Sequence, residues 1–350
     1  GAITLVGAEA YPPYQRPPLS KKYLAGELAR ERLFLRPAAF YAERGVDLIT
    51  GVRAEEIEPA LQRVRLADGR VLRYDGLLLA NGIAASLRPD ARVVLVGAGY
   101  IGLEVAAVLR QRGLDVTVLE AAGRVMPRTV SPEISSIYEG YHRAAGVKIE
   151  HGAAVSALRG VERVSAVETA DGRSFPCDVV IVGIGVVPNV ELSAAAGLQC
   201  NDGIVVDECA RTADPRIVAA GDCTSHPLPS LGGRRVRLES VPNAVHQAKL
   251  AAAALLGTPT AYSEVPWFWS DQYDLKLQIV GLSAGYDQVI VRGDPAARSF
   301  AAFYLAQGRL VAADAVNAPR EFLAAKKLVA DGAHVSPEKL RDTSVALDAL

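Results

Sequence analysis

Residues 92–104 read RVVLVGAGYIGLE, and the rest of the chain can be read outward from this stretch. The β-branched run 92–96 predicts a buried strand. Residues 100–112 predict a helix, and Gly113 follows in the position where a left-handed cap costs little. A second strand is predicted at 116–119. The order strand, glycine turn, helix, strand is typical of a nucleotide-binding βαβ unit.

Three glycines cross the turn between the first strand and the helix in the spacing Gly97-x-Gly99-x-x-Gly102. Gly97 permits the tight turn, Gly99 lets the backbone approach a pyrophosphate, and Gly102 lets helix and strand pack closely. The open amide groups at the start of the helix favour phosphates. Glu120 closes the second strand, where it can accept hydrogen bonds from ribose hydroxyls. A purely structural glycine turn does not explain this acid, so the stretch predicts a dinucleotide site.

Bulk properties narrow the class of protein. The 350 residues suffice for two or three domains, and a net charge of -1 gives no reason to expect nucleic acid or a membrane surface as partner. No apolar run is long and charge-free enough to span a bilayer. The cysteines form no CxxC or CxxxxC pair, which argues against a disulfide framework and a metal site and for a reducing compartment. They are Cys177, Cys200, Cys209 and Cys223. We expect a cytoplasmic protein, monomeric or weakly dimeric.

An internal repeat links the first eighty residues to those after Gly113. Gly146-Val147 matches Gly45-Val46, and the turn Asp171-Gly172 matches Asp68-Gly69. A buried run closes each copy thirteen positions after its turn glycine, at 82 and at 185. Two nucleotide-binding units, each with an inserted hairpin, are therefore predicted, and Glu9 is the counterpart of Glu120.

The first copy is incomplete at its start. Gly97 precedes Glu120 by 23 positions, whereas only eight residues precede Glu9. We therefore expect the first strand and its glycine turn to lie upstream of Gly1. The link between 82 and 92 is short for a domain crossover, so residues are expected to be missing there as well.

The remainder of the chain carries one further acid of interest. Asp222 ends a predicted strand, beside Gly221. Such a carboxylate can accept a hydrogen bond from a ribityl or ribose hydroxyl, or it can serve as a turn or cap residue. After it come a predicted helix at 241–256, a strand-turn-strand unit at 300–313 and a helix at 319–330, the last two typical of a small α+β domain.

Six stretches resemble the flavin-dependent ferredoxin reductases of oxygenase systems, a putidaredoxin-reductase-like group within the glutathione-reductase superfamily. They cover nearly the whole length, and ESVPNA together with PWFWSDQ is specific to this group. The stretches are PPYQRPPLSK (12–21), VGAGYIGLE (96–104), AAGDC (219–223), ESVPNA (239–244), PWFWSDQ (266–272) and VNAPREF (316–322). The chain departs from the family in lacking the first glycine turn and in its short interdomain segment.

The resemblance implies an α/β fold with two Rossmann-like domains of glutathione-reductase type, one for FAD and one for NAD, and a small α+β C-terminal domain. The implied FAD-binding domain comprises 1–90 and 204–258, the NAD-binding domain 91–203, and the C-terminal domain 259–350.

The same resemblance assigns residues to FAD. Glu9 would hold the adenosine ribose, and Ala54 would offer backbone contacts to the adenine. Arg16 and Lys21 would lie near the flavin and its phosphates, although Lys21 could be a solvated loop cation.

Three further residues are assigned to the flavin half of FAD. Arg128 would contact the flavin side, and Asp222 would bind the ribityl chain. Val241 would bring a helix N-terminus to the N1/O2 edge of the flavin, where its dipole stabilises negative charge.

For NADH, the resemblance assigns Gly97, Gly99, Gly102 and Glu120 to the dinucleotide and includes Gly185 among the cofactor-binding residues. Glu104 and Glu239 would lie near the nicotinamide, and Glu239 could equally be a surface charge. Trp269 would lie beside the flavin on the partner-facing side and line the electron exit, although Trp267 and Trp269 could simply be core.

The implied activity is electron transfer from NADH, through FAD, to a [2Fe-2S] ferredoxin that serves a cytochrome P450 or a ring-hydroxylating oxygenase. Disulfide reductases of the superfamily place paired cysteines beside the flavin. This chain has no such pair, so its electrons must leave to an outside acceptor. Basic residues are candidates for docking an acidic ferredoxin, namely Arg234, Arg235, Arg237, Lys326 and Lys327.

Three other interpretations stay open at this stage. The acceptor could be rubredoxin or another partner of an NADH-linked flavin reductase. The protein could be a flavoprotein that acts through protein binding, like apoptosis-inducing factor. The chain could also be a fragment without flavin.

Glu120 also predicts cofactor choice. A 2'-phosphate at about 4 Å from its carboxylate would meet a repulsion of roughly 4 kcal/mol at an effective dielectric near 20. Arg124 could relieve part of this repulsion. We therefore expect NADH to be preferred over NADPH.

Overall fold

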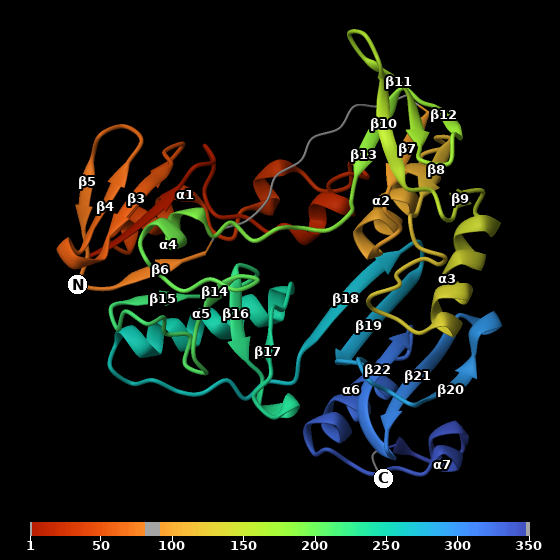
Figure 1. Cartoon of the computed structure of the whole chain (residues 1–350). Helices are drawn as coiled ribbons and strands as arrows, with labels where there is room; N and C mark the ends of the chain where they lie inside the picture. Colours follow the sequence, from red (N-terminus) through yellow and green to blue (C-terminus); the bar gives the residue numbers. More distant parts are fainter. Residues whose placement is uncertain (1, 81–91, 348–350) are drawn as a thin grey trace. The chain divides into compact units, whose positions relative to one another are not determined.

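The structure is a computed structural model that describes residues 2–80 and 92–347. The chain forms two compact units (Figure 1), which are described separately below. Unit 1 comprises Gly1–Pro18, Leu28–Ala84 and Val187–Pro266. Unit 2 comprises Leu19–Glu27, Ala85–Val186 and Trp267–Leu350. No helix within the described part of the chain is both long and apolar enough to cross a bilayer.

Unit 1 contains two parallel strand pairs, one small antiparallel sheet and one small mixed sheet. The strand β1 pairs with β2 and β6 pairs with β15, both in parallel, while β3-β4-β5 is an antiparallel sheet and β16 joins β14 to β17. The elements are β1 (Ile3–Gly7), η2 (Arg30–Leu33), α1 (Ala38–Glu43), β2 (Val46–Thr50), β3 (Ala54–Glu58), η3 (Pro59–Leu61), β4 (Arg63–Leu66), β5 (Val71–Arg73), β6 (Leu77–Leu79), α4 (Glu191–Ala195), β14 (Ile204–Val205), β15 (Ile217–Ala219), β16 (Thr224–Pro227), η4 (Pro229–Leu231), β17 (Arg235–Val236) and α5 (Val241–Leu255). The short turn η1 (Pro17–Ser20) spans the boundary at 18.

Unit 2 contains three sheets. The order β13-β7-β8-β9 is fully parallel, β10-β11-β12 is antiparallel, and β18-β19-β22-β21-β20 is a five-stranded antiparallel sheet. The elements are β7 (Val93–Val96), α2 (Tyr100–Gln111), β8 (Val116–Leu119), α3 (Pro132–Ala144), β9 (Lys148–Glu150), β10 (Val155–Gly160), β11 (Val164–Thr169), β12 (Ser174–Pro176), β13 (Val179–Val182), β18 (Trp267–Gln272), β19 (Leu275–Gly281), β20 (Gln288–Asp294), η5 (Pro295–Ala297), β21 (Ser299–Ala306), β22 (Arg309–Val316), α6 (Pro319–Ala330) and α7 (Pro337–Arg341).

The predicted nucleotide-binding stretch has the expected form. The central strand β7 is flanked by β13 and β8, and α2 follows it directly. Leu95 on β7, Leu103 on α2 and Val118 on β8 are almost fully buried in one hydrophobic cluster. Burial of this apolar face is the main force that holds the helix on the sheet.

The internal repeat is confirmed by backbone geometry. The turn glycines Gly69 and Gly172 both have a left-handed conformation, with φ of 88° and 86°. Each is held by the same pair of backbone hydrogen bonds, within the sheets β3-β4-β5 and β10-β11-β12. The strand entries after α1 and α3 also match, because Gly45 and Gly146 both have positive φ.

The two copies of the repeat differ in the central strand of the parallel sheet. In unit 2 the strand β7 lies between β13 and β8. In unit 1 the pairs β15-β6 and β1-β2 form separate sheets, and among residues 2–80 and 92–347 no strand takes the position equivalent to β7. The predicted missing residues between 82 and 92 lie largely outside the described part of the chain.

The C-terminal region has the predicted α+β character. The helix α6 packs on β19 and β22 of the antiparallel sheet, and Phe300, Phe303 and Tyr304 of β21 are fully buried. The turn of the predicted strand-turn-strand unit lies at Gln307-Gly308, with φ of 53° and 78°, and joins β21 to β22.

The compact units group the chain differently from the three predicted domains. Residues 187–203, assigned to the NAD-binding domain, belong to unit 1, and Leu19–Glu27 belongs to unit 2. Unit 2 also joins most of the predicted NAD-binding domain to the C-terminal domain. The three-domain division therefore stays a prediction.

Candidate functional site

The glycine turn of unit 2 is closely packed on two sides and open on the third. A Cβ atom on Gly97 would lie 2.6 Å from the carbonyl oxygen of Gly183, and one on Gly102 would lie 2.3 Å from that of Gly97. A Cβ on Gly99 would meet nothing within 4 Å. Two glycines are therefore required by packing, whereas Gly99 leaves space for a ligand at the start of α2.

The N-terminus of α2 suits an anionic ligand. Its N-cap is Gly99, which has no side chain to cap the first amide groups. By contrast, Ser131 caps α3 and Ser240 caps α5 through their hydroxyl groups. An uncapped helix N-terminus beside open space fits the pyrophosphate of a dinucleotide.

Glu120 has a second function that the sequence did not indicate. One carboxylate oxygen accepts the amide of Ala98 at 2.7 Å, and the other accepts that of Ala122 at 2.8 Å. The carboxylate therefore ties the glycine turn to the loop after β8. Each oxygen has two lone pairs, so Glu120 can still accept hydroxyl groups of a ribose.

Arg124 is engaged within unit 2. Its guanidinium donates to the carbonyl oxygens of Val130 at 2.9 Å and Pro127 at 2.8 Å. Arg128, by contrast, places its Nη2 3.3 Å from the position that a Cβ on Gly185 would occupy. Gly185 has a φ of 116°, which favours glycine, so Arg128 lies against a turn just after β13 that requires this residue.

Lys21 and Glu104 form a buried ion pair in unit 2. Lys21 Nζ lies 2.9 Å from Glu104 Oε1, and Glu104, on α2, is only 2% exposed. The hydroxyls of Ser20 and Ser270 each donate to this carboxylate at 2.7 Å. Such a buried charge is stable only with donors of this kind, so the predicted residues Lys21 and Glu104 act as one structural pair.

In unit 1, Asp222 lies in a turn that is held in place from α5. The Gln247 side-chain oxygen accepts the Gly221 amide at 2.8 Å and the Thr224 hydroxyl at 2.9 Å. Gly221 needs its φ of 86° for this turn. Asp222 therefore projects from the carboxyl end of β15 in a fixed direction.

The structure brings four predicted residues together around Asp222. The carboxyl group accepts the Ser240 amide at the start of α5, immediately before Val241. Asp222 keeps solvent contact, yet surrounding protein raises its pKa by desolvation, and the charge of Glu239 acts in the same direction. The charges of Arg237 and Arg16 oppose this shift only in part. An acid at a helix N-terminus beside an arginine suits a ligand with hydroxyl and phosphate groups.

Glu9 lies near the end of β1, as predicted, and is held by side chains. Arg16 Nη2 lies 3.1 Å from Glu9 Oε1, and Tyr14 is a hydrogen-bond partner of the same carboxylate. Desolvation opposes ionisation, but these two partners outweigh it and lower the pKa of Glu9. Ala54, the other residue assigned to the adenine end, begins β3.

Trp269 belongs to an aromatic group on β18 and α6 of unit 2. The ring centroids of Trp267 and Trp269 are 5.8 Å apart, and Phe322 lies 5.6 Å from Trp267. Lys326 Nζ lies over the Trp267 ring at 5.6 Å. Both tryptophans are only half-buried, so their rings retain solvent contact.

Two of the five basic docking candidates are engaged inside unit 1. Arg237 is 13% exposed and pairs with Glu239 and with Asp202. Arg235 donates to the backbone carbonyls of Val206 and Ser225. These guanidinium groups have structural partners, unlike the pattern expected of a solvated docking face.

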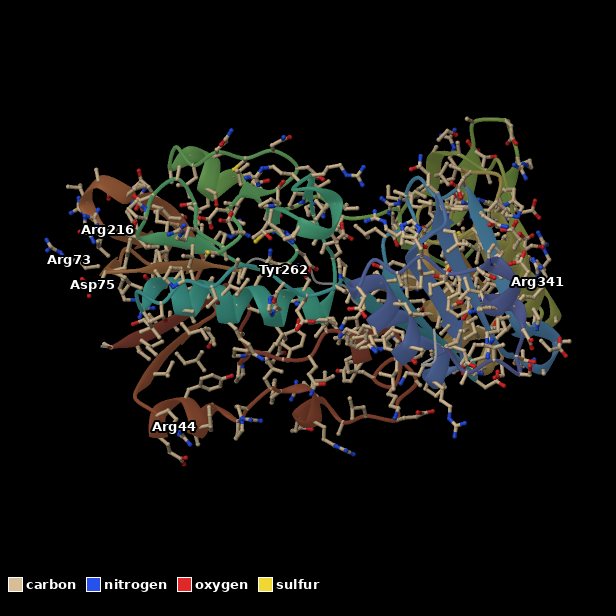
Figure 2. The ribbon with its side chains drawn as sticks, turned by 90° about the horizontal axis from the view of Figure 1, so that it is seen from below. Arg44, Arg73, Asp75, Arg216, Tyr262 and Arg341 are labelled. Carbon is tan, nitrogen blue, oxygen red and sulfur yellow. The ribbon has the colours of Figure 1, made fainter. Side chains whose placement is uncertain are left out.

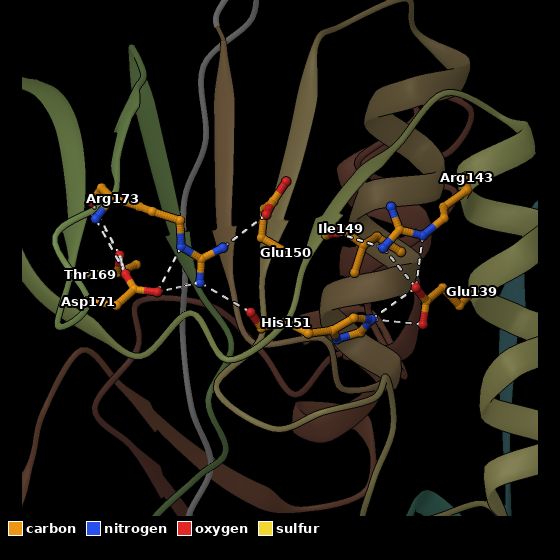
Figure 3. Close-up of polar contacts among 8 residues, drawn as sticks. All are labelled: Glu139, Arg143, Ile149, Glu150, His151, Thr169, Asp171 and Arg173. Carbon is orange, nitrogen blue, oxygen red and sulfur yellow. Dashed lines mark hydrogen bonds and ion pairs between the residues drawn. The ribbon is translucent and has the colours of Figure 1, made fainter.

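A polar network borders the loop that follows β9 (Figure 3). Arg173 contacts Glu150 at 3.0 Å, Asp171 at 2.8 Å and the carbonyl oxygen of His151 at 3.2 Å. His151 Nε2 also lies 2.9 Å from Glu139. The next residues pack on the Glu120 loop, since Ala153 N–H donates to the Glu120 carbonyl.

Sequence reasoning missed the partners of the predicted acids. The sequence marks Ser270 and Gln272 only as members of the PWFWSDQ stretch, and it gives no signal at His142 or Gln247. Their immediate neighbours are polar as well as apolar, so no local spacing singles these residues out. Only full burial of a polar side chain, at 0% exposure for Ser270 and Gln272, marks them.

Comparison with known proteins identifies the class. Residues 83–248 match the family described as pyridine nucleotide-disulphide oxidoreductase, and 267–350 match the family described as reductase C-terminal. Together with the glycine turn of unit 2, these matches define a pyridine-nucleotide-linked oxidoreductase.

Individual relatives narrow this class further. The 5,5'-dehydrodivanillate O-demethylase ferredoxin reductase subunit of Sphingobium sp. strain SYK-6 is 41% identical, over 100% of this chain and 92% of the relative. The ferredoxin reductase for the CYP199A2 system of Rhodopseudomonas palustris is 40% identical with a TM-score of 0.95, over 100% of this chain and 93% of that one. The reductase in the covalent putidaredoxin reductase–putidaredoxin complex is 42% identical with a TM-score of 0.94, over 99% and 91%.

The chain belongs to the ferredoxin reductases of oxygenase systems. The predicted family and fold class are thereby confirmed, and the family implies FAD and NADH as cofactors. The donor set fits both groups. The open side of Gly99 suits a dinucleotide, and the Asp222 carboxyl at the start of α5 suits a ribityl chain.

Proposed function

We propose that this chain carries electrons from NADH to a [2Fe-2S] ferredoxin that serves a cytochrome P450 or a ring-hydroxylating oxygenase. The main support is similarity of at least 40% over nearly the full length to reductases that are named for such systems. When bound, FAD supplies the conversion of a two-electron donation into single-electron steps. The protein binds the two cofactors, orients their rings toward each other and shields them from water.

In unit 2, we assign Gly97, Gly99 and Gly102 to the dinucleotide and Glu120 to its adenosine ribose. Gly97 and Gly102 shape the turn through packing, and Gly99 lets the pyrophosphate approach the α2 amide groups. Gly185 and Arg128 border the same edge of the parallel sheet, because β13 neighbours β7.

Glu104 is assigned to the nicotinamide end, and Lys21, which the resemblance places near the flavin, is assigned there with it because the two form an ion pair. The lysine ammonium and the glutamate carboxylate are held 2.9 Å apart. Because the pair is buried, its charges act with less screening than in water. A fixed pair of opposite charges can orient the polar carboxamide of a nicotinamide ring.

In unit 1, we assign Asp222 to the ribityl chain of FAD and the α5 N-terminus at Val241 to the electron-rich edge of its ring. Arg16 is assigned to the phosphates, with Glu9 and Ala54 at the adenosine end. Glu239, paired with Arg237, is assigned to the nicotinamide, as the resemblance implies. We also propose a cytoplasmic location, supported by four cysteines that remain thiols.

Trp269 is assigned to the electron exit, with Lys326 nearby as a docking cation. The half-buried pair of indole rings offers an apolar contact surface, and the Lys326 ammonium adds a positive charge beside it. An acidic ferredoxin would be steered by this charge, so its reduction rate should fall steeply with salt.

Stopped-flow kinetics on the full-length protein test this assignment. Trp269→Ala should slow reduction of ferredoxin far more than reduction of the bound flavin by NADH. Leu323→Ala, which truncates an exposed side chain on α6, is the matched control and should change neither rate by more than about twofold. Equal slowing of both half-reactions by Trp269→Ala would refute the exit role.

A further inference from the structure

A hydrogen-bonded chain of side chains runs through unit 2 to the Lys21–Glu104 pair. Its links are Tyr273 OH to His142 Nδ1 at 3.3 Å, His142 Nε2 to Gln272 Oε1 at 2.8 Å, Gln272 Nε2 to Ser270 Oγ at 3.1 Å, and Ser270 Oγ to Glu104 Oε1 at 2.7 Å. We call Ser270, Gln272, His142 and Tyr273 the supporting chain.

The supporting chain connects three separate elements. Glu104 lies on α2, His142 on α3, and Ser270 and Gln272 on β18. The exposed fraction is 2% for Glu104 and 0% for Ser270, Gln272 and His142. Replacing such a run with apolar side chains would avoid a large desolvation cost, so its presence in the core calls for a functional explanation.

The direction of every hydrogen bond is set by the anion at its end. Glu104 pairs with Lys21 and can only accept. Ser270 therefore gives its single proton to Glu104 and must accept from Gln272. This fixes the amide of Gln272 with its nitrogen toward Ser270 and its oxygen toward His142.

His142 must consequently carry its proton on Nε2, and its Nδ1 accepts from the Tyr273 hydroxyl. Burial lowers the pKa of His142 to about 4, although the Gln272 hydrogen bond raises it. A neutral ring agrees with this arrangement. All four links thus donate toward Glu104.

The supporting chain orients and does not conduct protons. The amide of Gln272 interrupts it, because an amide can donate and accept but does not readily give up its own proton. What the chain can do is hold the Glu104 carboxylate in one orientation. Lys21 is then confined as well, although its long side chain would otherwise have high rotamer entropy.

We propose that Ser270, Gln272 and His142 are positioning residues for the NADH-dependent half-reaction, acting through Glu104 and Lys21. The proposal rests on the proposed function, which assigns that ion pair to the nicotinamide. Active-site groups need support of this kind, because small misplacements of a charged group cost large factors in rate.

Gln272→Glu tests the proposal with almost no change in shape. A carboxylate at this position cannot donate to Ser270, so the serine proton is contested between two acceptors and Glu104 loses a fixed donor. We expect kcat/KM for NADH to fall about tenfold, the effect of one hydrogen bond to a charged group. The rate of the ferredoxin half-reaction should stay within about twofold of the wild type.

Gln288→Glu is the matched control, since it makes the same substitution at an exposed position of the same sheet, and it should leave both rates unchanged. Ring 15N NMR shifts of His142 give a readout that does not depend on turnover. In the wild type they should show a neutral Nε2–H tautomer. In Gln272→Glu they should show an imidazolium, which the new carboxylate stabilises.

The outcomes separate the two proposals. A wild-type protein that NADH does not reduce would overturn the proposed function. A wild type that turns over, with unchanged kcat/KM in Gln272→Glu or an Nδ1–H tautomer of His142, would overturn the positioning role alone. Should Gln272→Glu not fold, Ser270→Ala removes the last link with a smaller change and should cause the same selective loss.

Discussion

The two nucleotide-binding copies share a plan but hold their key acids in different ways. Both oxygens of Glu120 in unit 2 accept backbone amide groups, one of them from the glycine turn. Glu9 in unit 1 is held by the side chains of Tyr14 and Arg16. In both copies the backbone carbonyl of the acid accepts an amide that follows a neighbouring strand: that of Gly51 after β2 for Glu9, and that of Ala153 after β9 for Glu120.

This difference shows that equivalent positions in the two copies need not tolerate substitution of their neighbours equally well. Backbone donors are present whatever the neighbouring side chains are, so Glu120 forms part of the turn itself. Glu9 depends on a loop residue, Arg16, that is exposed. The unit 2 copy should therefore lose structure when its turn is altered, and the unit 1 copy should lose mainly ligand binding.

The largest effect is expected from Gly102→Ala. The added Cβ would lie 2.3 Å from the Gly97 carbonyl oxygen, so the helix must shift, and we expect a loss of about 1–3 kcal/mol of unfolding free energy together with loss of NADH binding.

Gly99→Ala is the matched variant, because the Cβ that it adds meets no atom within 4 Å. It should lower the free energy of unfolding by about 1 kcal/mol or less, yet weaken NADH binding. Urea denaturation and NADH titration measure both, and equal stability of the two variants would contradict the packing argument.

The cofactor preference should be the next largest effect. Glu120→Gln removes the charge that repels a 2'-phosphate, and the ratio of kcat/KM for NADPH to that for NADH should rise by up to about a thousandfold. In the wild type Arg124 is held by two backbone carbonyl oxygens, which limits how closely its guanidinium can approach a 2'-phosphate. Glu9→Gln serves as the control and should leave the ratio unchanged. A wild type that uses both cofactors equally well would contradict the assignment.

The sequence predicts both the parallel βαβ unit of unit 2 and the internal repeat. Gly97, Gly99 and Gly102 with Glu120 predicted the parallel βαβ unit, and the turns at Gly69 and Gly172 predicted the repeat. These features are local, since backbone conformation and spacing determine them. The partners of Glu104 were not accessible, because Ser270 and Gln272 reach it only through tertiary packing, 166 positions away in the case of Ser270.

Buried histidines offer a test that involves pH. Among the described residues, neither ring nitrogen of His226 in unit 1 has a hydrogen-bond partner. Its ring centroid lies 4.9 Å from that of Tyr262, which is labelled in Figure 2. Burial, helped by the charge of Arg235, lowers the pKa of His226 from 6.5 to about 4. Its contribution to stability is therefore present above pH 6.5 and is lost as the pH falls through about 4.

His226→Phe should remove this acid sensitivity and make the protein more stable than the wild type near pH 5. His142→Phe in unit 2 should instead destabilise the protein near neutral pH, because Gln272 and Tyr273 lose their partner. Urea denaturation between pH 4 and 7 measures both. If both variants changed the free energy of unfolding in the same way across this pH range, relative to the wild type, the hydrogen bonds of His142 would not distinguish it from His226.

The smallest expected effect compares the two hairpin turns. Arg70 forms its ion pair with Asp68 of its own turn, whereas Arg173 also contacts Glu150 and the His151 carbonyl (Figure 3). Arg173→Met should lower Tm measurably and speed amide exchange after β9. Arg70→Met should have little effect, because an isolated exposed ion pair contributes little. Equal changes in Tm for the two variants would contradict the claim that the additional contacts of Arg173 contribute to stability.

The visible absorbance spectrum of the full-length protein, before and after anaerobic NADH and then oxidised [2Fe-2S] ferredoxin, tests the central claim most directly. Flavin bands should be present, bleach with NADH and return as ferredoxin is reduced. A protein whose flavin bands bleach but never return with any [2Fe-2S] ferredoxin would contradict electron delivery to that partner. A protein that binds no flavin would contradict the roles assigned to Asp222 and Val241.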